Sequence, residues 1–141
     1  MTTIQKFIIT LFLQNLTKPI VCTGSIIPLS QNGSDALSNL EGALMIAASK
    51  NVPKIPEVCI YFDGVLMRGN RTIKVSNKVH HPFKSPKCQP FAFRRSDGEF
   101  DLHVKHIMRH EDQLPTIFNS GKLCCNIGII HLFPSIPLTQ V

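Results

Sequence analysis

Two short, uninterrupted apolar runs constrain the fold of this 141-residue chain more than any other feature of it. The first is Ile20–Cys22 and the second is Val58–Phe62. Apolar runs without polar alternation are typical of strands that are buried on both faces, as in parallel sheets whose strands alternate with helices. The sequence therefore predicts an α/β fold in which a parallel sheet forms the middle of three layers.

Two stretches with helical periodicity accompany these strands. Residues 2–16 predict an amphipathic helix that ends at Thr17-Lys18-Pro19, because proline cannot continue a helix. A second helix is expected to begin near Ser34-Asp35, whose short polar side chains can cap it, and to end before Asn51-Val-Pro53. Its apolar stripe is predicted to consist of Leu37, Leu40, Ala43, Leu44 and Ala47. Residues 2–62 then have the order α-β-α-β.

The chain changes character after about residue 76. Asp63-Gly64 is expected to turn the second strand back into Val65–Met67, but three prolines, at positions 82, 86 and 90, then indicate loops. A hairpin around Ser96-Asp97-Gly98 is predicted, with strands at Phe91–Arg94 and Phe100–Val104. One more buried strand is expected at Ile127–Phe133. We divide the chain into an α/β unit (1–86), a linker with this hairpin (87–125) and the start of a further domain (126–141).

Charge and cysteine content exclude several classes of protein. The formal net charge of +6 is modest, and prolines and an aspartate interrupt its densest stretch, residues 84–95, so we predict no nucleic-acid binding. The five cysteines are odd in number and form no CxxC pair, which favours reduced thiols, a cytoplasmic location and no zinc site. The apolar run at Phe7–Leu13 is too short to span a membrane. His80, His81, His103, His106 and His110 leave a metal site as an alternative, although no cofactor or metal is expected.

Lys74 is the candidate catalytic residue. It closes the segment Arg68-Gly-Asn-Arg-Thr-Ile-Lys74, which follows the second apolar strand and its turn, so we expect Lys74 at the lip of a buried strand. An ammonium that a tight backbone holds in one direction can assist proton transfer. The alternative is a solvated lysine after a loop.

Three segments carry a resemblance to a known family. Lys18–Pro28, Ser34–Ala47 and Ile55–Lys74 occur in the order and at the spacing of the type I (cytosolic) L-asparaginases, and the animal form described as a lysophospholipase with an asparaginase domain is especially similar. The resemblance covers most of residues 1–86 and about ten residues near the end of the chain. It implies the latter half of the asparaginase N-terminal domain, followed by a linker and the first strand of the C-terminal domain.

The resemblance implies an amidohydrolase that converts L-asparagine and water to L-aspartate and ammonia. In such enzymes a threonine hydroxyl attacks the side-chain amide, and a lysine assists by moving its proton. The matching lysine is Lys74, and the Thr-Gly-Ser turn implies substrate contact at Gly24 and Ser25. Lys18 matches a junction without a chemical role. The family also implies a homo-oligomer and no cofactor.

The sequence departs from the family in ways that affect activity. Neither threonine motif of the family, Thr-Gly-Gly-Thr or His-Gly-Thr-Asp-Thr, occurs in it, and the second motif would end close to Met1. Ile73 stands where type I enzymes carry a threonine tied to allosteric asparagine binding, and Ile26 stands where the family usually has glutamine. We therefore expect negligible turnover from this chain alone. Two alternatives stay open: a non-catalytic truncated paralogue that pairs with a full-length asparaginase, and an incomplete gene model.

Overall fold

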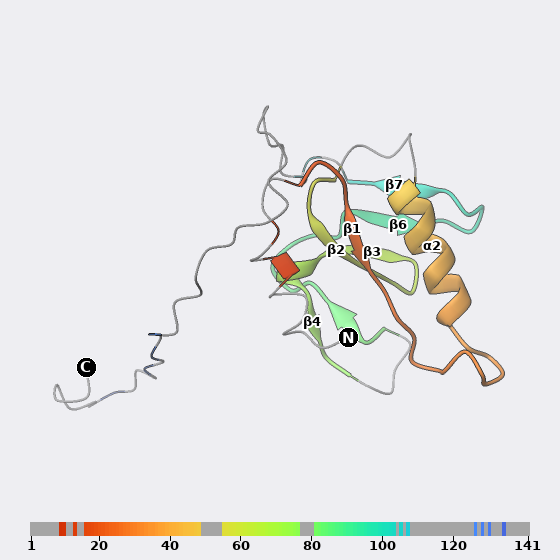
Figure 1. The fold of residues 1–141 in the computed structure, drawn as a ribbon, viewed down its shortest axis with the longest axis horizontal. Helices are drawn as coiled ribbons and strands as arrows, with labels where there is room; N and C mark the ends of the chain where they lie inside the picture. Colours follow the sequence, from red (N-terminus) through yellow and green to blue (C-terminus); the bar gives the residue numbers. More distant parts are fainter. Residues whose placement is uncertain are drawn as a thin grey trace.

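The structure, a computed structural model, describes residues 16–48, 55–76 and 81–103, together with positions 9, 10, 13, 105, 107, 126, 128, 130 and 134. One helix and seven strands are defined in these residues, with a short 3-10 helix between β3 and β4 (Figure 1). In chain order they are β1 (Ile20–Cys22), α2 (Ala36–Ala48), β2 (Val58–Phe62), β3 (Val65–Arg68), η1 (Gly69–Arg71), β4 (Ile73–Lys74), β5 (Phe83–Lys84), β6 (Ala92–Arg94) and β7 (Phe100–Leu102). The predicted strands at 20–22 and 58–62 and the helix after Asp35 are confirmed.

The main sheet has five strands in the order β1-β2-β3-β6-β7, and it is mixed and not parallel. Only β1 and β2 run parallel, with Val21 opposite Cys59, whereas the remaining neighbours are antiparallel. The parallel-sheet prediction is therefore wrong beyond the first pair of strands. A two-residue turn at Asp63-Gly64 sets the direction of β3, because it can join only antiparallel strands.

Both predicted hairpin turns are present. Asp63 and Gly64 have positive φ angles of 49° and 76°, as a two-residue turn that matches strand twist requires. The β6-β7 hairpin turns at Gly98, whose φ is 90° and whose N–H donates to the Arg95 carbonyl over 3.0 Å. This hairpin joins the main sheet, because the Phe91 N–H donates to the Leu66 carbonyl over 2.7 Å. Residues 91–102 are thus built onto the same sheet as β1, β2 and β3.

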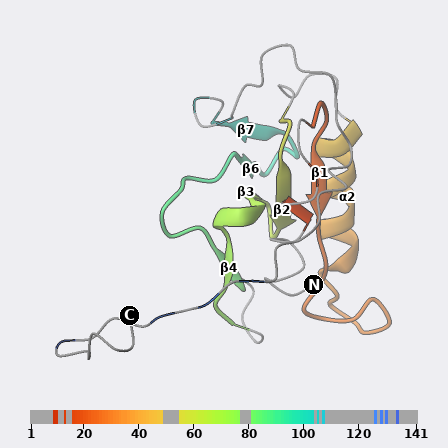
Figure 2. The same ribbon diagram turned by 60° about the vertical axis from the view of Figure 1, so that its left-hand side comes forward.

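Helix α2 packs against β1 and β2 with a face that the sequence did not predict (Figure 2). The buried residues are Asn39, Gly42, Ala43 and Ile46, while Leu37, Leu40 and Leu44 are 67%, 48% and 59% exposed. Most of the predicted stripe therefore faces solvent. The helix approaches the sheet closely at Gly42, where a Cβ atom would lie 2.3 Å from three atoms of the Tyr61 side chain. A larger residue cannot replace glycine at this contact without moving the helix or the Tyr61 ring.

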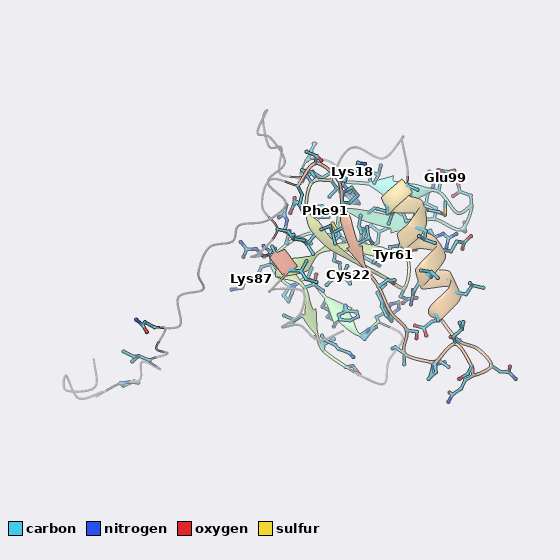
Figure 3. All side chains as sticks on the ribbon, in the orientation of Figure 1. Lys18, Cys22, Tyr61, Lys87, Phe91 and Glu99 are labelled. Atoms are coloured by element: carbon cyan, nitrogen blue, oxygen red, sulfur yellow. The ribbon has the colours of Figure 1, made fainter. Side chains whose placement is uncertain are left out.

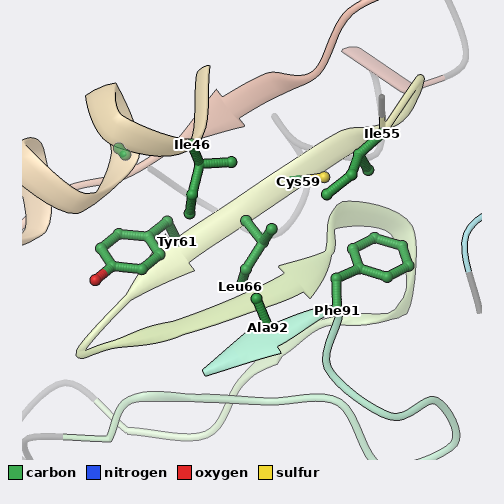
Figure 4. Close-up of a cluster of buried hydrophobic side chains, with 8 residues drawn as sticks. Ile46, Ile55, Cys59, Tyr61, Leu66, Phe91 and Ala92 are labelled. Atoms are coloured by element: carbon green, nitrogen blue, oxygen red, sulfur yellow. The ribbon is translucent and has the colours of Figure 1, made fainter. Parts of the chain in front are cut away.

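The core lies between α2 and the main sheet (Figure 4). Its buried members come from α2, from β2 and β3, from the start of β6 and from residues just before β2 and β6: Ala43, Ile46, Ile55, Cys59, Tyr61, Leu66, Phe91 and Ala92. Phe91 lies just before β6 and Ala92 is its first residue, so the hairpin contributes to the core as well as to the sheet. The rings of Tyr61 and Phe100 meet edge to face at 5.9 Å and extend this packing toward β7.

Strands β4 and β5 form a separate two-stranded sheet, which we call the arm. Figure 2 shows the arm below the main sheet, reached from β3 through η1. The two strands pair Ile73 with Lys84 and Lys74 with Phe83, and the Val75 N–H donates to the Pro82 carbonyl over 2.8 Å.

Two predicted elements lie largely outside the described residues. Of the helix predicted at 2–16, Ile9 and Thr10 are described and helical, and the Leu13 N–H donates to the Ile9 carbonyl over 3.1 Å. Most of the strand predicted at 127–133 is not described. No helix in the described part of the chain has the length and hydropathy needed to cross a membrane.

Candidate functional site

The three candidate residues meet at one cavity of about 150 Å³. Its walls come from the end of β1 and the loop after it, from β2, and from the arm. They comprise Cys22, Thr23, Gly24, Ser25, Ile26, Ile60, Phe62, Lys74, Pro82 and Phe83. Cys22 lies at the end of β1 near the centre of the molecule (Figure 3). Lys74 thus lines the same cavity as Gly24 and Ser25, although the sequence separates them by a helix, two strands and a 3-10 helix.

Lys74 was expected at the lip of a buried strand. This expectation is wrong, because both residues of β4, the strand that carries Lys74, are exposed. The arm carries it instead. The Nζ atom of Lys74 lies 5.9 Å from the centre of the Phe83 ring, and Phe83 meets Phe62 of β2 edge to face at 5.2 Å. This chain of contacts ties the arm to the main sheet and keeps the ammonium beside the Phe83 ring.

The base of the arm is fixed by a buried ion pair. Arg68, the last residue of β3, donates from Nη2 to Glu57 Oε1 over 2.9 Å and from Nε to Oε2 over 2.5 Å. The hydrogen bond to Glu57 raises the pKa of Arg68 above its usual range. The guanidinium also lies 4.9 Å from the centre of the Phe91 ring, and the Arg68 carbonyl accepts a 2.6 Å bond from the Thr72 hydroxyl. The chain is therefore held firmly up to Thr72, two residues before Lys74.

The opposite wall, residues 23–27, is called the loop wall. Its anchor is Asn39, a polar residue that is only 2% exposed. The Nδ2 atom of Asn39 donates to the Gly24 carbonyl over 2.9 Å, and its Oδ1 accepts from the Asp63 N–H over 2.9 Å. The Thr23 hydroxyl donates to the Tyr61 carbonyl over 2.8 Å. Side chains of α2 and the loop thus connect the candidate substrate loop to the end of β2.

Asp35 completes this network. Its carboxylate accepts hydrogen bonds from the N–H groups of Ile26 (3.0 Å) and Ile27 (2.9 Å), and from Asn39 Nδ2 (3.0 Å). Burial raises the pKa of Asp35, but the bonds from Ile27 and Ile26 outweigh it and leave the pKa below its usual value. Of the two residues expected to cap α2, Ser34 does so, because its Oγ accepts a bond from the Ala36 N–H over 3.1 Å.

Sequence reasoning did not assign Asp35 or Asn39 to the site. The available signal was their spacing, because polar residues at i and i+4 share one face of a helix. Asn39 interrupts the apolar pattern on the helix face that is buried, where an unpaired amide would be costly. A buried Asn on the sheet side of a helix therefore indicates a hydrogen-bonded partner in a neighbouring loop.

A second cavity of about 310 Å³ lies beside the first and shares Phe62, Pro82 and Phe83 with it. At its edge Nδ1 of the exposed His81 imidazole contacts the Asp63 carboxylate. No three His, Cys, Asp or Glu side chains in the described ranges come together as metal ligands. Of the histidines considered for a metal site, 80, 106 and 110 lie outside those ranges.

The described cysteines form no disulfide with one another. Cys22 and Cys59 lie in β1 and β2 as predicted, and Cys88 lies in the loop after β5. Burial raises the pKa of the Cys59 thiol, so this thiol is protonated and unreactive at neutral pH.

Comparison with known proteins identifies the family. Residues 6–107 match the family described as "Asparaginase, N-terminal". The chain is 40% identical over 129 residues to an L-asparaginase of Dirofilaria immitis, and this match covers 92% of this chain and 21% of the relative. It is 33% identical over 141 residues to the 60 kDa lysophospholipase of Mus musculus, covering 95% of this chain and 23% of the relative.

A solved structure agrees with these sequence matches. The crystal structure of L-asparaginase I from Vibrio cholerae O1 biovar eltor superposes with a TM-score of 0.71 at 28% identity, over 96% of this chain and 39% of that one. This chain therefore spans between about a fifth and two fifths of the relatives that it matches. With most of its length matched by the family's N-terminal domain, the chain belongs to the asparaginase family.

Proposed function

We propose that this chain supplies the lysine-bearing part of a site that hydrolyses L-asparagine to L-aspartate and ammonia. The observation that carries the proposal is the single cavity lined by Lys74, Gly24 and Ser25. Its volume of about 150 Å³ suits a small polar molecule. Lys74 brings a proton-transfer group, and the loop wall brings backbone close to a ligand.

The reaction requires an attacking hydroxyl. A threonine oxygen adds to the side-chain amide carbon of asparagine, ammonia leaves, and water then hydrolyses the resulting ester to aspartate. Lys74 would assist by taking the proton from the hydroxyl and passing it toward the leaving nitrogen. Thr23 lines the cavity but is unsuited to attack, because its hydroxyl proton is donated to the Tyr61 carbonyl.

Negligible turnover of the 141-residue chain alone follows from this assignment, because the sequence contains neither threonine motif of the family. Loss of one member of a cooperating catalytic group typically costs several orders of magnitude in rate. The direct test is ammonia release from L-asparagine by the purified chain. Release at the rate of an intact asparaginase would contradict the assignment of the nucleophile to a segment outside this sequence.

A chimera tests the role of Lys74. Residues 18–103 of this chain would replace the matching segment of the Vibrio cholerae L-asparaginase I, which then supplies the rest of that enzyme. We expect asparaginase activity that falls by about a thousandfold or more in Lys74→Met. Lys84→Met is the matched control, because Lys84 is an exposed lysine on the paired strand that does not line this cavity. A chimera that stays active without Lys74 would refute the proposed role.

A second candidate function follows from the partial match to the relatives, of which the chain spans between about a fifth and two fifths. We propose that an inactive chain pairs with a full-length family member as a non-catalytic partner, which co-purification with an intact asparaginase would test. A cytoplasmic location belongs to both proposals and is favoured because the described cysteines form no disulfide with one another.

A further inference from the structure

The peptide between Gly24 and Ser25 has a fixed orientation that depends on α2. No cis peptide bond is found in the described part of the chain, so the Gly24 carbonyl and the Ser25 N–H point in opposite directions. Asn39 Nδ2 binds that carbonyl over 2.9 Å. The Ser25 N–H must therefore point away from Asn39. Gly24 and Ser25 line the cavity whereas Asn39 does not.

The Ser25 N–H is available to a ligand. Within the described residues no group accepts a hydrogen bond from it, and Ser25 is exposed. An oriented N–H that is not used by the protein can donate to an oxygen of a molecule in the cavity. If the peptide flipped, the carbonyl of Gly24 would face the cavity instead and would repel the same oxygen.

The loop itself offers little resistance to such a flip. Glycine lacks the Cβ atom that restricts its neighbouring peptides, and a Cβ built on Gly24 would meet nothing within 4 Å. Packing therefore does not fix this peptide. The hydrogen bond from Asn39 is the contact that does so.

Asn39 is in turn oriented by two partners. Its second Nδ2 hydrogen binds Asp35 over 3.0 Å, and its Oδ1 accepts from the Asp63 N–H over 2.9 Å. Asp35 also binds the N–H groups of Ile26 and Ile27, just beyond the peptide in question. These bonds leave the Asn39 amide one arrangement that satisfies all of its partners.

We propose that Asn39, held by Asp35, is a positioning residue that keeps the Ser25 N–H directed into the substrate cavity. This inference rests on the proposed function only for the identity of the ligand. The orientation of the peptide can be measured without any ligand.

The first test uses the full-length chain without substitution. Amide hydrogen exchange measured by NMR should be fast at Ser25, whose N–H faces the cavity, and slow at Asp63, whose N–H is bound by Asn39. Equal protection at both positions would overturn the proposal. This measurement does not depend on whether the chain binds any substrate or product.

The second test uses L-aspartate, the product of the proposed reaction, as the probe. Asn39→Asp keeps the size and the acceptor for Asp63 but removes the donors to the Gly24 carbonyl and to Asp35, and it places two carboxylates side by side. We expect the Ser25 amide resonance of the free chain to move and the affinity for L-aspartate to fall by about tenfold. Asn32→Asp, the same substitution in an exposed loop position, should change neither. Unchanged aspartate affinity in Asn39→Asp would overturn the proposal.

An exchange of the two side chains separates positioning from stability. In Asp35→Asn/Asn39→Asp, the amide at position 35 can donate to the carboxylate at position 39, so the pair is restored, but no donor faces the Gly24 carbonyl. The midpoint of thermal unfolding should return toward that of the unsubstituted chain while aspartate binding stays weak. Recovery of both would show a merely structural role. Failure of the unsubstituted chain to bind aspartate would instead count against the proposed function, and the Ser25 amide resonance of the free chain in Asn39→Asp would still decide the role of Asn39.

Discussion

The two walls of the cavity are held in place by different means. The loop wall is fixed chiefly by the buried Asn39 of α2 and by Asp35, just before the helix, whose side chains bind its backbone directly. The arm is fixed through its base at Arg68 and then, beyond Thr72, by two residue pairs and by aromatic contacts. A network of buried hydrogen bonds resists local opening better than a two-residue ladder on the surface. The candidate lysine therefore sits on the less constrained wall.

The largest effect is expected at the base of the arm. Arg68→Met removes the guanidinium that binds both oxygens of the Glu57 carboxylate, which is 6% exposed. Removing one member of a buried ion pair typically costs about 3–5 kcal/mol, and urea unfolding would measure the loss. The control is Arg71→Met, because Arg71 lies three residues nearer to Lys74 but is exposed on η1. Its free energy of unfolding should stay within about 0.5 kcal/mol of that of the unsubstituted chain. Equal losses would show that the base of the arm is no firmer than its tip.

A matched pair of glycine substitutions compares the support of the loop wall with the loop itself. Gly42→Ala places a methyl group against the fully buried Tyr61 and should destabilise the chain by about 1–3 kcal/mol in thermal or urea unfolding. Gly24→Ala meets no neighbouring atom and should change stability by less than about 1 kcal/mol, in the stabilising direction. A tolerated Gly42→Ala would mean that α2 can move away from the sheet, and the loop wall would then be the less constrained one.

The outer part of the arm is sensitive to its aromatic contacts. Phe83→Leu removes the edge-to-face contact with Phe62 and the ring beneath Lys74, contributions of about 0.5–1.5 and 0.5–1 kcal/mol. Amide exchange at Val75, which binds the Pro82 carbonyl, should accelerate about fivefold or more, whereas exchange at Leu66 in the core changes less. Phe93→Leu, on the distant hairpin, is the control that should leave Val75 unaffected. Parallel changes at Val75 and Leu66 would show that the arm does not open by itself.

The sequence predicted the elements of the fold better than their arrangement. Continuous apolar runs identified β1 and β2, and the dipeptides Asp63-Gly64 and Asp97-Gly98 identified both hairpin turns, because these features act over a few residues. The direction of the strands was mistaken since an apolar run shows burial on two faces but not the partner strand. The prediction that the leucine stripe is buried was wrong because α2 packs against the sheet at Gly42, its smallest residue. Hydrophobic periodicity does not detect such a contact.

The site was predicted in a similarly uneven way. Lys74, Gly24 and Ser25 were named from segments that resemble the family, and the structure brings them to one cavity, although their chemical roles stay predictions. Asp35 and Asn39 were not named, because their partners are backbone groups of the loop, and a carbonyl or an N–H has no sequence signature. Residues that bind substrate through side chains are accessible to sequence reasoning, whereas residues that orient backbone become visible only in three dimensions.

The smallest effect expected is a pH dependence confined to the loop wall. The pKa of Asp35 is lower in the folded chain than its usual value, so the folded state binds that proton less tightly than the unfolded state does. The stabilisation is therefore complete above the unfolded pKa, near 4, and is lost as the pH falls through the lower folded pKa.

Asp35→Asn removes this contribution, so the stability difference between the unsubstituted chain and the variant should shrink on acidification below about pH 4. Protection of the Ile27 N–H, which the carboxylate binds, should fall in the same range in the unsubstituted chain, while protection of the Val75 N–H in the arm stays constant. Asp101→Asn on β7 matches the change in charge at an exposed position and should leave the protection of Ile27 unaltered. If acid instead loosened Val75 first, the arm would depend on a carboxylate as well, and the contrast between the two walls would lose its electrostatic basis.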